Sequence, residues 1–315
     1  MFKLQTFLTT SPEKAAEYIK RGGIVAFPTE TVYGLGASLF NENAIARLFK
    51  VKKRPTDNPL IVHISSVDQI GELVAGIPVR AEKLINAFFP GPLTIVLYRS
   101  GKVSSIATAG LDTIGIRMPR LEIANTFLSA CGVPVVAPSA NISGRPSPTK
   151  WQAVSEDMFG KTDCILQGEA AEIGLESTVV DCTGEEPLVL RQGAISIEEL
   201  KKVVGNTRIY NPTKGDVIRS PGLKHRHYAP KATVRIVNDG SQITEPENKA
   251  FIGLRDLGLP FKRKRISSSV DEYAHDLFEF FRDCDRQAIN TIYCERVEET
   301  GIGAALMDRL RRAAE

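Results

Sequence analysis

Two cations near the end of a predicted helix form the first group that could do chemistry. Lys52 and Arg54 lie two residues apart where that helix gives way to KKRPTDNPL, and Pro55 and Pro59 prevent it from continuing. Two positive charges presented at a fixed turn suit an anion such as a polyphosphate. Lysine and arginine are also favoured at a solvated helix end that binds nothing. The pair alone therefore leaves both interpretations open.

A second group of polar side chains follows a predicted strand directly, in APSANISGRPSPT. Ser139, Asn141 and Ser143 offer short hydrogen-bonding side chains, and Gly144 lets backbone N–H groups approach a ligand closely. The phosphate-binding pattern G-x-x-x-x-G-K-[ST] is absent from the whole chain. The alternative is a turn rich in serine and asparagine that needs no ligand.

Polar groups also follow other predicted strands. The segment PTETVYGLG carries Thr29, Glu30, Thr31 and Tyr33, which would suit a small polar substrate or equally cap the next helix. Arg117 ends a strand, where a buried arginine usually pairs with a carboxylate or phosphate. His63 lies inside an apolar strand, where a satisfied core histidine is the commoner case. Further polar groups at strand edges are Glu176, Ser177, Thr178, Arg191 and Gln192.

Several kinds of site are disfavoured. His225 and His227 form an H-x-H pair, but zinc sites usually need three or four protein ligands, so we expect no metal held by protein side chains. The segment GIGAALMDRL lacks the full dinucleotide-binding pattern. No serine–histidine–aspartate order or paired-carboxylate pattern stands out. The basic run Lys262–Arg265 is interpreted first as a solvated loop, and only second as a patch that touches RNA.

Composition narrows the class of protein. The chain has 315 residues, of which 43% are hydrophobic and 24% charged, with a formal net charge of +3. This charge is too small to indicate nucleic-acid binding by itself. The five cysteines include no C-x-x-C pair, which favours a reducing compartment. We expect a cytoplasmic protein, because we find neither a secretory signal nor a run of about 20 apolar residues.

Alternating strands and helices predict an α/β fold with two domains. Expected helices span residues 11–21, 41–52, 67–74, 79–88, 197–204, 271–282 and 302–312. Expected strands span residues 24–27, 60–64, 94–98, 114–117, 133–137, 164–166, 178–182, 188–191, 234–237, 250–252 and 291–293. Residues 208–232 are rich in proline, glycine and basic side chains and show no sustained period, so they are interpreted as a linker. The expected domains are therefore 1–207 and 233–315.

Seven segments in order carry a resemblance to a known family. They are PTETVYGLG, KKRPTDNPLIVHI, GIRMP, APSANISG, ESTVVD, LRQG and HYAP. Together they resemble the threonylcarbamoyl-AMP synthase family in its long form, with a YrdC-like catalytic domain and a small C-terminal domain. The resemblance implies a twisted, largely parallel or mixed sheet flanked by helices and enclosing a basic cavity. It also implies a small Rossmann-like second domain and a linker that closes over the cavity.

The resemblance assigns roles residue by residue. On the nucleotide side it implies contacts to ATP from Lys52, Arg54, Asn58, Thr113, Ser139, Asn141, Ser147 and Arg191. Lys52 and Arg54 are the implied catalytic pair, which stabilises charge on the triphosphate. On the threonine side it implies contacts from Thr31, His63, Arg117, the backbone at Ala137, and Ser177. His227 and Tyr228 match the linker motif that gates the cavity.

The activity implied by the resemblance is nucleotidyl transfer. L-threonine, bicarbonate and ATP would give threonylcarbamoyl-AMP and pyrophosphate, for modification of the adenosine next to the anticodon of tRNA. Mg²⁺ would accompany ATP, held mainly by the phosphates. A tRNA-modifying transferase complex would receive the product, with at most a weak contact to tRNA and none to a membrane.

Three other functions compete with this interpretation. An RNA-binding module would bind RNA in a salt-dependent way without consuming ATP. A carbamoyl-transfer enzyme of hydrogenase maturation has a related domain, but it also carries zinc-finger cysteines that this chain lacks. A nucleotide-binding regulator would bind ATP and release no pyrophosphate.

Overall fold

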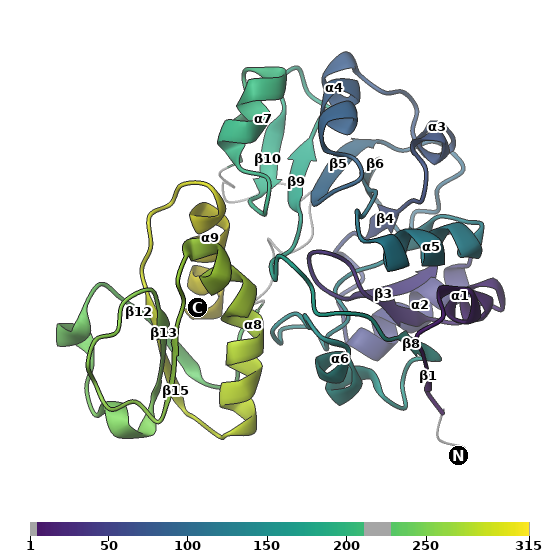
Figure 1. The fold of residues 1–315 in the computed structure, drawn as a ribbon. Helices are drawn as coiled ribbons and strands as arrows, with labels where there is room; N and C mark the ends of the chain where they lie inside the picture. Colours follow the sequence, from purple (N-terminus) through teal and green to yellow (C-terminus); the bar gives the residue numbers. More distant parts are fainter. Residues whose placement is uncertain (1–4, 211–227, 315) are drawn as a thin grey trace.

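The computed structural model describes residues 5–210 and 228–314. Within these ranges, eleven strands form one large sheet and four strands form a second, smaller sheet. No helix in the described ranges is long and apolar enough to cross a membrane. Figure 1 shows the two sheets in separate parts of the molecule.

The large sheet has the strand order β1-β8-β2-β3-β7-β4-β6-β5-β9-β10-β11. Its strands are β1 (Phe7–Thr9), β2 (Val25–Phe27), β3 (Gly34–Ser38), β4 (Ile61–His63), β5 (Leu93–Tyr98), β6 (Thr113–Arg117), β7 (Val135–Val136), β8 (Cys164–Leu166), β9 (Thr178–Asp181), β10 (Leu188–Arg191) and β11 (Arg208–Ile209). Among the described strands, five neighbouring pairs are parallel and five are antiparallel. The expected layered α/β fold is confirmed, and the sheet is of the mixed kind.

Helices cover this sheet. They are α1 (Pro12–Lys20), α2 (Glu42–Lys52), the 3-10 turn η1 (Val67–Gln69), α3 (Ile70–Leu73), α4 (Val79–Phe88), α5 (Glu122–Cys131), α6 (Trp151–Met158) and α7 (Ile197–Val204). Ser11 caps α1, because its side chain accepts a hydrogen bond from the backbone N–H of Lys14 at 3.2 Å. Helix α2 ends at Lys52, followed by Lys53 in the left-handed conformation.

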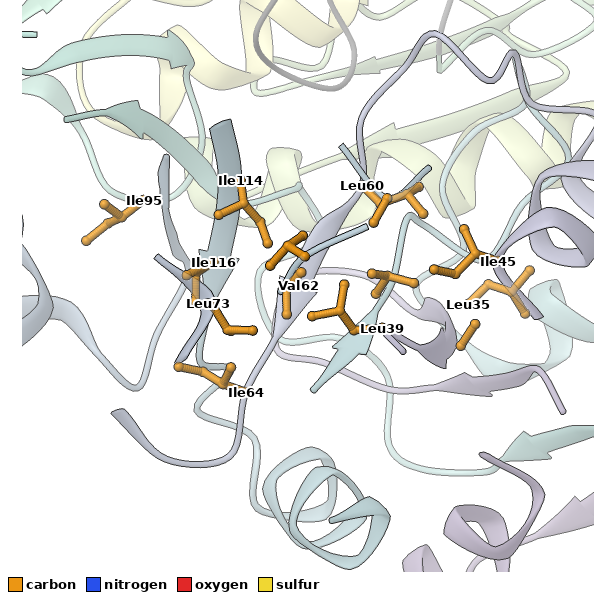
Figure 2. Packing of buried hydrophobic residues seen from close by; sticks show 14 of the residues in the cluster. Leu35, Leu39, Ile45, Leu60, Val62, Ile64, Leu73, Ile95, Ile114 and Ile116 are labelled. Atoms are coloured by element: carbon orange, nitrogen blue, oxygen red, sulfur yellow. The ribbon is translucent and has the colours of Figure 1, made fainter. Parts of the chain in front are cut away.

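One apolar core fixes the strands that later carry the site. Its members include Leu35, Leu39, Ile45, Leu60, Val62, Ile64, Leu73, Ile95, Ile114 and Ile116 (Figure 2). Strand β4 is buried on both faces, since Val62 packs in this core while His63 on the opposite face is only 4% exposed. Such double burial explains why the chain places near-continuous apolar runs here.

Several elements of the first domain differ from the sequence prediction. Strand β3 was interpreted as part of a polar loop, and β1, α5 and α6 were not predicted. The glycines of β3 allow its tight packing, because a Cβ at Gly36 would lie 2.8 Å from Val135 and 3.1 Å from the Phe27 ring. Helices α5 and α6 have no side-chain cap at Leu121 or Lys150, so the usual start signal is missing.

The second domain is a parallel sheet with helices. Its strands have the order β12-β15-β13-β14 and all neighbouring pairs are parallel. The elements are β12 (Thr233–Val237), η2 (Gly240–Gln242), η3 (Pro246–Asn248), β13 (Ala250–Gly253), β14 (Arg263–Ile266), α8 (Val270–Arg286), β15 (Thr291–Glu295) and α9 (Ile302–Ala314). Helices α8 and α9 lie between this sheet and the first domain (Figure 1).

The basic run predicted as a solvated loop is instead the edge strand β14. Arg263 pairs with Asp283, Lys264 with Asp256, and Arg265 with Glu272 and Asp276. These cations therefore have acidic partners inside their own domain. The expected linker begins with β11, whose Arg208 and Ile209 pair with β10 of the first sheet. His225 and His227 lie outside the described residues.

Candidate active site

A pocket of about 630 Å³ opens among strands near the middle of the large sheet. This volume includes space open to solvent, and the room left for water-sized molecules is about 60 Å³. Its lining comprises Thr29, Thr31, Val32, Tyr33, Gly34, Arg54, Pro59, Leu60, Ile61, His63, Arg117, Ala137, Pro138, Ser139, Glu176, Ser177, Arg191 and Tyr228. Segments far apart in sequence therefore meet here, including residues expected on both the nucleotide side and the threonine side.

Strand β6 delivers Arg117 to the pocket with its hydrogen bonds already made. Its guanidinium donates to Glu30 Oε1 at 2.7 Å and to Thr31 Oγ1 at 2.7 Å. The Arg117 and Glu30 side chains are 5% and 0% exposed, so the ion pair is fully desolvated. A buried pair of this kind holds both side chains in one arrangement, since either charge alone would be costly to bury. Contact of Arg117 with a threonine carboxylate stays a prediction.

His63 ends strand β4 and faces the same pocket. Burial, followed by the nearby Arg117 guanidinium, lowers the pKa of His63 to about 3. The imidazole is therefore neutral at physiological pH. Within the described part of the chain, Nδ1 of His63 is buried and has no hydrogen-bond partner. A neutral ring with an unmatched nitrogen suits a polar substrate that brings its own hydrogen-bond partner.

Two residues expected on opposite sides of the site contact each other. Arg191 at the end of β10 donates from Nε and from one terminal nitrogen to the carbonyl of Ser177, at 3.1 and 3.0 Å. Ser177 Oγ also lies 2.8 Å from Thr94 Oγ1 of β5. Gly193 permits this approach, because a Cβ there would lie 2.3 Å from the Thr178 nitrogen. The expected nucleotide and threonine sides therefore meet at Arg191 and Ser177.

Lys52 lies behind the pocket rather than on its lining. Its ammonium donates to the carbonyls of Ser139 and, at 2.5 Å, of Asn141. Burial, followed by the charge of Arg54, lowers the pKa of Lys52, while its two carbonyl acceptors stabilise the charged form. The side chain thus anchors the polar loop that follows β7. Direct contact of Lys52 with phosphates stays a prediction.

Arg54 is the cation of the K-x-R pair that lines the pocket. One terminal nitrogen donates to the carbonyl of Pro59 at 3.1 Å, and burial lowers the pKa of Arg54 to about 10, so it stays charged. Among the described residues, Arg54 Nε and the neighbouring Asn58 Nδ2 are buried without hydrogen-bond partners. Buried donors without partners are costly, and a bound anion would satisfy them.

The other expected nucleotide contacts have different surroundings. Asn141 accepts from Ser139 Oγ at 2.6 Å and donates to two carbonyls of its own loop, so its side chain mainly shapes that loop. Ser147 donates to Glu176 Oε1 at 2.5 Å. Thr113 begins β6 and is not part of the pocket lining. Of the eight expected nucleotide residues, Arg54, Ser139 and Arg191 line the pocket, whereas all five expected threonine residues do.

Sequence reasoning assigned no specific contact to three charged residues that the structure places at the pocket or behind its lining. Glu30 and Glu176 were noticed as polar groups at strand ends, and Arg309 was not singled out. Arg309 of α9 is 0% exposed and donates from Nε to Glu176 Oε2 at 2.9 Å. A signal was available, because Arg309 occupies a position on the apolar face of α9 between Leu306 and Ala313.

The positive charge expected of the cavity stays a prediction that its lining supports. Three arginines and one glutamate, Glu176, line it, and the acidic partner of Arg117 lies behind it. Burial alone would raise the pKa of Glu176, but Arg309 and Arg191 outweigh it and hold that pKa below its usual range. No group of three His, Cys, Asp or Glu side chains in the described residues is arranged to hold a metal ion.

Comparison with known proteins agrees with this geometry. Residues 17–193 match the family described as "Telomere recombination", and residues 195–315 match "Threonylcarbamoyl-AMP synthase, C-terminal domain". The chain is 44% identical to a threonylcarbamoyl-AMP synthase of Pyrococcus abyssi, over 95% of this chain and 93% of that protein. It is 35% identical to a Bacillus subtilis protein of the same name, over 97% and 94%.

The fold of this chain is similar to that of a solved structure. P. abyssi Sua5 complexed with L-threonine superposes with a TM-score of 0.91 at 41% sequence identity, covering 98% of each chain. The two family matches together cover both domains, and the two relatives and this structure each extend over both. The family suggested by the seven sequence motifs is thereby confirmed, and the chain belongs to the threonylcarbamoyl-AMP synthase family.

Proposed function

We propose that this chain makes threonylcarbamoyl-AMP from L-threonine, bicarbonate and ATP, and releases pyrophosphate. The observation that carries the proposal is one pocket in which a complete set of five expected threonine contacts lies beside Arg54 and Arg191. The unmatched donors of Arg54 and Asn58 give an anionic ligand something to bind. The product would serve modification of the adenosine next to the anticodon of tRNA, in the cytoplasm.

The reaction needs positioning more than a covalent intermediate. The amine of threonine and bicarbonate give a carbamate and water. A carbamate oxygen then attacks the α-phosphorus of ATP, and the bond to the β-phosphate oxygen breaks as pyrophosphate leaves. Arg54 and Arg191 would neutralise charge on the phosphates, and holding the two reactants in line would supply much of the acceleration. Lys52 would act through the loop that it anchors.

Mg²⁺ would supply charge neutralisation on the triphosphate when it arrives with ATP. Arg54 and Ser139 would contact the phosphate groups that hold this ion. We propose the phosphate oxygens as the main ligands of the ion, and a transferase complex that modifies tRNA as the acceptor of the product.

Selectivity for threonine would follow from the expected threonine side of the pocket, whose residues lie on or beside strands. A site built around hydrogen bonds to a hydroxyl rejects alanine and glycine strongly, because its own buried groups are left unmatched. Serine lacks only a methyl group, so we expect rejection by roughly 10- to 200-fold. His63 and Thr31 are the side chains that we expect to contact the substrate hydroxyl or amine.

The experiment is pyrophosphate release by the full chain with ATP, Mg²⁺ and bicarbonate, with and without L-threonine. Arg54→Met should reduce threonine-dependent release by at least about 10-fold, the value of one charge-assisted hydrogen bond. Lys53→Met is the matched control, since Lys53 is exposed and lies next to Arg54. Pyrophosphate release that does not depend on threonine would contradict the proposal, and salt-dependent RNA binding without it would favour an RNA-binding module.

A further inference from the structure

Two buried arginines of the second domain donate into the first domain. Arg282 of α8 and Arg309 of α9 are 1% and 0% exposed. Arg282 donates to the carbonyl of Pro146 at 2.7 Å and to Asp157 Oδ2 at 2.8 Å. Arg309 donates to Glu176 Oε2 at 2.9 Å and to the carbonyl of Gln192 at 3.0 Å. A guanidinium is expensive to bury without such partners, so both contacts hold the domains together.

The two arginines differ in what they hold. The acceptors of Arg282 are not part of the pocket lining, whereas the carboxylate of Glu176 is. The guanidinium carbon of Arg309 also lies 5.1 Å from the ring centre of Tyr228, a second lining residue. That ring stacks on Phe278 of α8 with centroids 5.5 Å apart. Helices α8 and α9 thus form the backing of one pocket wall.

Glu176 is held from both sides. Its Oε1 accepts from Ser147 at 2.5 Å and its Oε2 accepts from Arg309. Arg309 comes from a different domain, so this carboxylate has its present arrangement only while the second domain is docked. Without Arg309, the remaining cation whose charge lowers the pKa of Glu176 is Arg191, which is otherwise held by Ser177. Glu176 would then compete with the nucleotide for the guanidinium of Arg191.

We propose that Arg309 is a positioning residue of the active site. By fixing Glu176 and backing Tyr228, it makes the second domain part of the pocket wall and keeps Arg191 directed toward the phosphates. Arg309 touches neither substrate in this proposal and acts only through residues that line the pocket. The proposal rests on the synthase activity proposed above, and it adds a catalytic task to a domain that otherwise only packs against the first.

The test uses two variants that keep the fold. Arg309→Lys retains the charge but loses the fork that spans Glu176 and Gln192. The double variant Arg309→Met with Glu176→Gln removes both charges, so no unpaired charge is left buried. Two single substitutions are matched controls. Arg286→Ala removes an exposed ion pair across the same interface, with Glu156 at 3.0 Å, and Arg311→Ala removes an exposed arginine of the same helix.

Kinetics separate positioning from simple docking. A variant that only loosens docking leaves fewer competent molecules, so kcat falls while KM is unchanged. We expect Arg309→Lys to raise the KM for L-threonine or ATP at least about 10-fold, because a misplaced wall weakens substrate contacts. Arg286→Ala and Arg311→Ala should stay within about 2-fold of the unaltered chain. An unchanged KM in Arg309→Lys would overturn the proposal, whether kcat falls, as loss of docking alone predicts, or stays like that of the controls.

Hydrogen exchange of the ligand-free protein decides the same question without the reaction. The amide of Ala229 donates to Gly144, and that of Thr178 donates to Pro92, each at 3.0 Å. Ala229 follows Tyr228 directly and Thr178 lies two residues after Glu176, so both amides should exchange faster in Arg309→Lys than in Arg286→Ala. Equal exchange in the two variants would overturn the proposal even if the chain released no pyrophosphate. Failure of the synthase activity alone would leave the faster exchange intact.

Discussion

The two sides of the pocket are built in different ways. On the expected threonine side, Arg117, Thr31 and Ser177 lie on or beside strands and already have protein hydrogen-bond partners. On the expected nucleotide side, Arg54 and Asn58 lie on a loop after α2 and keep buried donors without partners among the described residues. Among the described residues, the threonine side is largely formed before any ligand arrives, with Nδ1 of His63 left unmatched, whereas Arg54 and Asn58 on the nucleotide side both keep unmatched donors.

This difference teaches where stability and binding are coupled. A residue whose charge is matched inside the protein stabilises the fold, and its removal leaves an unpaired partner. A buried donor without a partner costs stability in the free protein and returns that free energy when a ligand binds. Substitutions on the threonine side should therefore lower stability first, and substitutions on the nucleotide side should lower affinity for ATP first.

The largest effect should come from Arg117→Met. This change leaves the carboxylate of Glu30 buried and unpaired, which costs roughly 3–5 kcal/mol in the free energy of unfolding. Urea denaturation followed by circular dichroism measures the loss. The double variant Arg117→Met with Glu30→Gln should recover most of it, since no charge is then left alone. A loss below about 1 kcal/mol in the single variant would show that this side is not preformed.

Lys52→Met should come next, because it removes the anchor of the polar loop after β7. Its two acceptor carbonyls, of Ser139 and Asn141, would lose their charged donor. Displacement of the loop by about 1 Å should reduce threonine-dependent pyrophosphate release roughly 100-fold. Lys50→Met is the control, since Lys50 is an exposed lysine of the same helix. Equal activities of the two variants would show that Lys52 has no role on the nucleotide side.

Asn58→Ala should have a smaller effect that is confined to ATP. The Nδ2 atom has no partner to lose in the described structure, so removing this unmatched donor should leave the free energy of unfolding unchanged or raise it by about 1 kcal/mol. Loss of one neutral hydrogen bond to the nucleotide should raise the KM for ATP roughly 2- to 10-fold. The KM for L-threonine should stay the same. Comparable increases in both constants would break the distinction between the two sides.

Much of the fold near the site was accessible from sequence because local patterns decide it. The elements Val79–Phe88, Cys164–Leu166 and Ile197–Val204 match the predicted bounds. Apolar periodicity marks α4, and a capping box of Ser196 with Glu199 starts α7. Strand β3 was missed because its identity depends on pairing with β2 and β7. Its glycine-rich segment has no local strand pattern to read.

The sequence predicted which residues belong to the candidate site, but not which of them pair with one another. The resemblance assigned roles to nine of the lining residues, among them Arg54, Arg117 and Tyr228. They did not indicate that Arg117 already has Glu30 as its partner, because residues 87 positions apart meet only in the folded chain. Arg309 was missed for the same reason, as its acceptor Glu176 lies 133 positions away. Partner choice is a property of the tertiary structure.

The smallest expected effect tests the threonine side through pH. Burial holds the pKa of His63 at about 3 in the folded chain, against 6.5 for an exposed histidine. Between these values the unfolded chain binds a proton that the folded chain does not, so stability falls as pH falls below about 6.5. From pH 8 to pH 6 this contribution should decrease by about 0.8 kcal/mol, and any folded pKa below 5 gives nearly the same figure.

His63→Gln should remove this part of the pH dependence, since glutamine does not titrate. Urea unfolding of both proteins at pH 6 and pH 8 isolates the contribution, because the carboxylates of the chain affect both alike. The unaltered protein should lose about 0.8 kcal/mol more than the variant over this interval. Identical losses would mean that His63 binds a proton as readily in the fold as in water. The ring would then be open to solvent, and the threonine side would not be formed before its ligand arrives.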